Sequence, residues 1–126
     1  MHPNAQAVMK GFEAFAEGDM EGMRSLFTED AVWHTGGKNK WSGDYSGVDA
    51  MLQFFGEISG EATIDNQPHS LLADDKHVVA LVESNITRGD ESITAQQIFI
   101  FHANEGVVSE VWATALDQYA LDAFWG

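Results

Sequence analysis

The sequence predicts an α+β fold, in which helices come first along the chain and an antiparallel sheet follows. Within residues 4–17 and 48–58, apolar side chains recur at the spacing of amphipathic helices. After Ala62 the pattern changes to β-rich runs separated by short polar turns: residues 62–73, 77–87, 91–102 and 107–116. Four successive strands joined by tight turns predict an antiparallel meander, and the helices are expected to pack on one of its faces.

Short signals between these segments predict where the other elements begin and end. Asp19 stands in the N-cap position of a short second helical segment, whose apolar face runs to Phe27. Residues 30–35 suit a short strand, and residues 36–40 form a polar, glycine-rich loop. Pro68 cannot donate a backbone hydrogen bond, so its run is expected to be an edge strand or to contain a bulge.

Composition narrows the classes of function. A chain of 126 residues with 44% apolar content predicts one domain over residues 1–126. The formal charge of −14 disfavours nucleic acid and anionic membrane surfaces as partners. The chain has no leader pattern and no apolar run long enough to cross a membrane, which predicts a cytoplasmic protein. With no cysteine and no His-x-x-x-His spacing, no metal site is expected.

Four segments follow one another in an order that is typical of a known superfamily. Residues 12–19 and 26–34 combine an aromatic helix, a Gly-Asp turn and a Leu-Phe-x-x-Asp-Ala pattern before a strand. Residues 45–47 and 106–112 add a Tyr-Ser-Gly helix start and a late strand. Together they resemble the SnoaL-like branch of the nuclear transport factor 2-like superfamily. The resemblance covers nearly the whole chain and implies a cone-shaped fold around a pocket, a homodimer formed through the open sheet face, and no cofactor.

The same superfamily holds polyketide cyclases and ketosteroid isomerases, and the isomerase machinery can be compared position by position. By this resemblance, Gly11 stands where an isomerase carries its oxyanion tyrosine, and Thr35 stands where it carries its aspartate base. Gln97 takes the place of a protonated aspartic acid and can still donate a hydrogen bond. Steroid isomerisation by that machinery is therefore not expected.

His34 and Asp117 are the candidate catalytic residues. An imidazole titrates near neutral pH, and a desolvated carboxylate after a late strand suits proton transfer. The resemblance to SnoaL-like proteins implies an acid/base carboxylate from the late strands, which we carry over to Asp117. Two alternatives stay open: His34 as a structural histidine at a strand end, and Asp117 as the N-cap of a short C-terminal helix. In a regular strand His34 faces away from Trp33 and Thr35, so His34 and Trp33 cannot both line a pocket without a bulge.

Four residues are candidates for binding a substrate: Trp33, Trp41, Gln97 and Trp112. Trp112 and Gln97 lie on strands expected to form the floor of the cone, and each has a polar group that needs a partner if buried. Trp41 lies in the loop region and is either a lid or an ordinary loop anchor.

The sequence thus leads to two hypotheses about function. The first is a SnoaL-like protein that performs cofactor-free general acid/base chemistry of the isomerase, cyclase or hydrolase type on a small apolar compound, either polycyclic or carbonyl-bearing. The second is a non-catalytic ligand-binding or dimerisation module of the same fold, which predicts a pocket that is small, or filled by side chains such as Phe99 and Trp112, or without a carboxylate.

Overall fold

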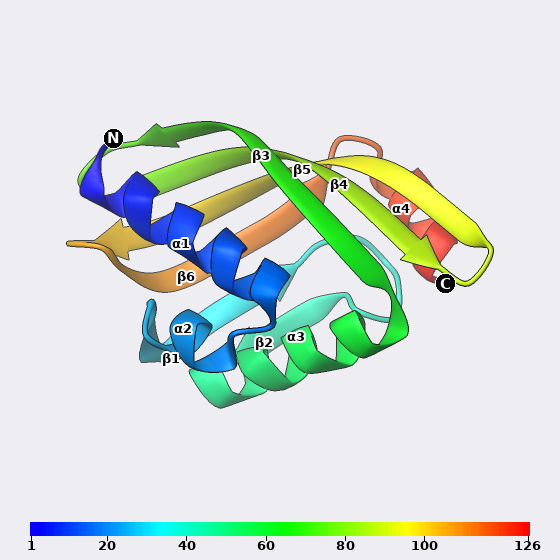
Figure 1. Cartoon of the computed structure of the whole chain (residues 1–126), viewed down its shortest axis with the longest axis horizontal. Helices are drawn as coiled ribbons and strands as arrows, with labels where there is room; N and C mark the ends of the chain where they lie inside the picture. Colours follow the sequence, from blue (N-terminus) through cyan, green and yellow to red (C-terminus); the bar gives the residue numbers. More distant parts are fainter.

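The computed structural model describes all residues from 1 to 126 and contains four helices and six strands. In chain order they are α1 (Pro3–Glu17), α2 (Met20–Arg24), β1 (Phe27–Thr35), β2 (Gly43–Ser46), α3 (Val48–Glu61), β3 (Thr63–Ala73), β4 (His77–Arg88), β5 (Glu91–Asn104), β6 (Val107–Ala115) and α4 (Gln118–Trp125). Figure 1 shows the helices α1 and α3 on one side of a curved, open sheet, with α4 at the end of the sheet remote from the N-terminus. The predicted α+β class and cone-shaped fold are confirmed.

The strand order of the sheet is β2-β1-β6-β5-β4-β3. Strands β3 to β6 form the predicted antiparallel meander. One part of the prediction needs correction: β1 pairs antiparallel with β2 but parallel with β6, so the sheet is mixed rather than wholly antiparallel. Strand β6, the last of the meander, lies beside β1 and runs in the same direction. Local sequence patterns do not predict a pairing between segments so far apart in the chain.

Local chemistry explains the boundaries of the first two helices. Pro3 occupies the first turn of α1, where its missing N–H costs nothing, and Gly18 ends the helix in the left-handed region at φ 68°. Asp19 caps α2 as predicted, accepting a hydrogen bond from the Gly22 N–H at 2.9 Å. The helical segment predicted to reach Phe27 is too long, because β1 already begins at Phe27.

Strand β3 lies at an edge of the sheet, and its register with β4 shifts between Pro68 and Ser70. Pro68 was expected to imply either an edge strand or a bulge, and β3 has both features. An edge strand tolerates a residue that cannot donate a backbone hydrogen bond to a neighbouring strand. The shift in register also lies at this edge, so it does not disturb the pairing of the inner strands.

The core lies between the helices and the inner face of the sheet. One buried cluster joins α3 and α4 to the sheet around Met51, Phe55 and Ile86, and the other packs α1 against the centre of the sheet around Val82 and Phe99. Trp33 packs against both clusters. A cavity remains where the two clusters meet.

Candidate functional site

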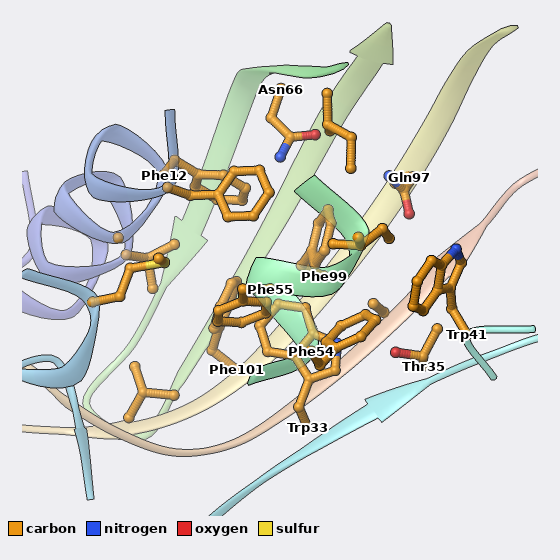
Figure 2. Close-up of a pocket in the computed structure, with 18 of the residues that line it drawn as sticks. Phe12, Trp33, Thr35, Trp41, Phe54, Phe55, Asn66, Gln97, Phe99 and Phe101 are labelled. Atoms are coloured by element: carbon orange, nitrogen blue, oxygen red, sulfur yellow. The ribbon is translucent and has the colours of Figure 1, made fainter. Parts of the chain in front are cut away.

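A mostly apolar cavity of about 130 Å³ lies between the helices and the inner face of the sheet. Hydrophobic residues make up 19 of the 24 that line it, so it is an apolar container with a few polar points. An apolar cavity of about 150 Å³ is large enough to hold benzene, and this one is of that order. Ten of the 24 are aromatic, and those from α1, α3, β1 and β5 that Figure 2 labels are Phe12, Phe54, Phe55, Trp33, Phe99 and Phe101.

A short hydrogen-bonded chain supplies two of the polar points. The Gln97 amide donates to the Ser84 hydroxyl at 2.8 Å, and that hydroxyl donates to the Asn66 side-chain oxygen at 2.7 Å. Ser84 is completely buried. Gln97 and Asn66 both line the cavity, on β5 and β3, and Figure 2 shows them on the same side of it. The chain fixes both amides and leaves the other polar atom of each without a protein partner.

Trp41 and Thr35 form a second polar region, near Gln97 in Figure 2. Trp41 is only 8% exposed, and its ring packs against Phe54 and Trp125. Its indole N–H and the Thr35 hydroxyl are buried and have no hydrogen-bond partner in the protein. Unpaired buried polar atoms are costly, and such atoms beside a cavity are candidates for contact with a ligand.

The loop that carries Trp41 is fastened to α4 through Asp122. Its carboxylate accepts hydrogen bonds from the Lys38 N–H at 3.0 Å, from the Asn39 amide at 2.8 Å and from the Gln118 amide at 2.9 Å. These bonds, that from Gln118 above all, hold the pKa of Asp122 below its usual value. The loop and α4 therefore close this end of the cavity as one unit.

His34 lies on the outer face of the sheet, away from the cavity. Its two ring nitrogens are each 2.6 Å from a carboxylate oxygen, one of Asp44 and one of Glu110, and its ring stacks on Trp112 at a centroid distance of 5.1 Å. The hydrogen bond to Glu110, followed by the one to Asp44, raises the pKa of His34 above 6.5. The imidazole therefore favours its charged form, in which both nitrogens donate.

Asp117 is exposed and caps α4, because its carboxylate accepts the Ala120 N–H at 3.1 Å. This is the capping arrangement that the sequence left open as an alternative. Neither Asp117 nor His34 is among the residues that line the cavity, and Trp112 lies outside it as well. Of the six candidate residues, the cavity brings together Trp33, Trp41 and Gln97. The alternation argument holds, since Trp33 and Thr35 point inward and His34 points outward.

Comparison with known proteins decides the family. The SnoaL-like domain pattern matches residues 8–111. The chain belongs to the SnoaL-like family. Among solved structures, this SnoaL-like protein is similar to Bal32a from a soil-derived mobile gene cassette, with 32% identity, a TM-score of 0.93, and coverage of 98% of this chain and 97% of that one.

Two more distant structures share the fold of this SnoaL-like protein. A nuclear transport factor 2-like protein from Burkholderia xenovorans LB400 is 20% identical, with a TM-score of 0.88 and coverage of 98% and 96% of the two chains. TerC, co-crystallised with polyporic acid, is 18% identical, with a TM-score of 0.85 and coverage of 95% of each chain. No curated protein matches the sequence.

Among the residues that sequence reasoning did not name as site candidates are Asn66 and Trp125, which line the SnoaL-like cavity, and Ser84, which hydrogen-bonds to Asn66. Asn66 and Ser84 are directly opposite in the β3–β4 pairing, and each interrupts a strand otherwise read as apolar on that face. The available signal was a polar residue at an inward position on each of two neighbouring strands, since buried polar groups need partners.

No helix of the SnoaL-like protein combines the length and apolar character that crossing a membrane requires. No group of three or more His, Asp or Glu side chains has an arrangement suited to a metal ion.

Proposed function

We propose that this SnoaL-like protein binds a small, mostly apolar molecule in its cavity and does not perform acid/base chemistry on it. One observation carries the proposal: none of the residues that line the cavity is Asp, Glu, His, Lys, Arg, Tyr or Cys. General acid/base catalysis needs a titratable group within hydrogen-bond reach of the substrate. The amides of Gln97 and Asn66 and the hydroxyl of Thr35 orient a ligand but exchange no proton with it near neutral pH.

The acid/base hypothesis places its chemistry on His34 and Asp117, and their positions weigh against it. His34 is held between two carboxylates on the outer face, and Asp117 is occupied as a helix cap. The two residues would have to reach a substrate from outside the cavity. The binding hypothesis needs no such rearrangement, because the aromatic wall and the fixed amides are already present.

The test is native mass spectrometry of the protein purified under mild conditions, followed by identification of any retained small molecule. A matched pair of variants on β6 shows where it sits. Ala113 lines the cavity and Thr114 is exposed, so Ala113→Leu fills the site whereas Thr114→Leu adds the same side chain outside it. Loss of the retained molecule in Ala113→Leu alone supports the proposal. Turnover of the molecule that disappears in His34→Gln or Asp117→Asn would overturn it.

The homodimer expected from the resemblance is proposed to use the outer face of the sheet. Strand pairing aligns Leu72, Val79, Ile100, Trp112 and His34 in one row across that face. Leu72 is 60% exposed and Ile100 38%, which leaves an apolar surface that a second copy could cover. Light scattering of the wild type should give twice the monomer mass, and Ile100→Glu should give the monomer. A monomeric wild type would refute the dimer without touching the binding proposal.

A further inference from the structure

We infer that the cavity selects a neutral ring compound that carries both a hydrogen-bond donor and a hydrogen-bond acceptor, and that the chain Gln97–Ser84–Asn66 makes this selection. The inference rests on the proposed binding function and adds to it the chemistry of the ligand. Its basis is the hydrogen-bonded relay Gln97–Ser84–Asn66, in which the Ser84 hydroxyl joins the two amides that line the cavity.

The relay presents one donor and one acceptor for a reason that does not depend on how the amides are oriented. Ser84 is 0% exposed, so its hydroxyl hydrogen needs an acceptor inside the protein. It donates to one amide oxygen, here that of Asn66, and accepts from the NH₂ of the other, here Gln97. The free atoms are then the Gln97 oxygen and the Asn66 nitrogen. Rotating both amides exchanges the two roles and still leaves one acceptor and one donor.

The ligand is neutral because the cavity offers nothing to balance a charge. No Lys, Arg or His lines it to pair with a carboxylate, and no Asp or Glu lines it to pair with an amine. Burying an unpaired ion costs far more than two neutral hydrogen bonds return. The ligand contains rings because ten of the 24 lining residues are aromatic, and aromatic side chains favour edge-to-face and offset contacts with another ring.

The polar end extends beyond the relay. Trp41 and Thr35 line the same cavity as Gln97 and are drawn on its side in Figure 2, and their indole N–H and hydroxyl lack protein partners. A hydrocarbon that filled this end would leave all of these polar atoms unpaired in a dry site. A ligand with a carbonyl and a hydroxyl group forms hydrogen bonds with the free amide atoms of Gln97 and Asn66.

Four probes on a single benzene ring, the size that the cavity admits, test this chemistry: benzene, benzaldehyde, phenol and 3-hydroxybenzaldehyde. They carry, in that order, neither group, the carbonyl, the hydroxyl and both groups. Binding is measured by isothermal titration calorimetry. We expect roughly fivefold tighter binding for each hydrogen bond gained, so that 3-hydroxybenzaldehyde binds tightest and benzene weakest. Benzoate, the matching carboxylate, is expected not to bind.

Two variants and a matched control assign the selectivity to the relay. Gln97→Leu removes one presented atom, so it should bring 3-hydroxybenzaldehyde close to the better of the two singly substituted probes. Ser84→Ala releases both amides, so it should bring 3-hydroxybenzaldehyde close to benzene. Gln96, the exposed neighbour on β5, binds Glu83 on the surface, so Gln96→Leu should leave the preference intact. Circular dichroism checks folding, and Ser84→Ala carries the test should Gln97→Leu fail to fold.

The outcomes separate this inference from the proposed function. Equal affinity for all four probes, or tight binding of the carboxylate, would overturn the inference and leave the binding function standing. A preference for 3-hydroxybenzaldehyde that survives in both relay variants would overturn the role of the relay. Absence of binding by every probe would overturn the inference alone, because native mass spectrometry of a retained molecule tests the proposed function separately.

Discussion

Replacing Arg88 with methionine should loosen α4 and open the end of the cavity that Trp125 covers. The Arg88 guanidinium donates to the carbonyls of Phe124 at 2.6 Å and Trp125 at 3.4 Å, and to Glu61 at 3.2 Å. It also lies over both aromatic rings, 4.9 Å from the centre of Phe124 and 5.6 Å from that of Trp125. These contacts satisfy the last carbonyls of a short helix that has no basic residue in its own last turn.

The structure sets the expected size of this effect. A hydrogen bond from a charged group contributes about 1.5–3 kcal/mol when buried, and a cation–π contact adds about 0.5–1 kcal/mol at an exposed site. Because the Arg88 side chain is 24% exposed, water compensates part of this, and we expect Arg88→Met to lower the free energy of unfolding by roughly 2–3 kcal/mol. Arg24, which is 42% exposed and pairs with Asp49 at 2.7 Å, is the matched control. Arg24→Met should cost far less, because an exposed ion pair contributes little to stability.

The assay is urea unfolding followed by tryptophan fluorescence, together with the dissociation rate of a bound probe. Arg88→Met should shorten the residence time of the probe, because Trp125 lines the cavity, whereas Arg24→Met should not. Equal loss of stability in the two variants would refute the reasoning. So would a destabilised Arg88→Met protein that releases its probe at the wild-type rate.

Three further changes test the structure at separate points. Because the pKa of His34 is raised in the folded protein, its contribution to stability is complete below pH about 6.5 and is lost as the pH rises through the folded-state pKa. His34→Gln should therefore flatten this part of the curve of stability against pH. An unchanged curve would be inconsistent with the Glu110 contact. Thr35→Asp places a carboxyl in the apolar cavity, where burial raises its pKa, so this variant should be closer to wild-type stability at pH 5 than at pH 8 in thermal unfolding, and an equal loss of stability at the two pH values would mean that residue 35 faces solvent. Met51 is fully buried, so Met51→Ala should cost about 2–5 kcal/mol in urea unfolding, and a cost below 1 kcal/mol would contradict its place in the core.

The elements that the sequence predicted well are those with a strong repeating pattern. The helix of residues 4–17 and the strand runs after Ala62 differ from the structure by only a few residues, because one face of each is buried and the apolar period is clear. Strand β2 was missed, since most of Gly43–Ser46 is exposed and shows no alternation. The parallel pairing of β1 with β6 was missed because it joins distant parts of the chain.

The site was predicted only in part, for a different reason. Alternation along β1 correctly placed Trp33 and Thr35 on the opposite face from His34, because side-chain direction in a strand is a local property. Which face is concave depends on the assembled sheet. Trp112 was expected on the floor of the cone, but its pairing with His34 and Ile100 puts it on the outer face.

Neighbouring residues on the strands of this protein belong to different chemical environments. His34 and Thr35 are such a pair, and so are Gln96 and Gln97: in each pair one residue faces solvent or charged partners and the other faces the cavity. The charged side chains, which sum to a net charge of −14, therefore lie outside the cavity, and only uncharged groups line it. Salt screens interactions between exposed charges far more than it changes neutral hydrogen bonds in a buried site. The affinity for a neutral ligand should thus be nearly independent of ionic strength, whereas any association through the face that carries His34, Asp44 and Glu110 should depend on both salt and pH.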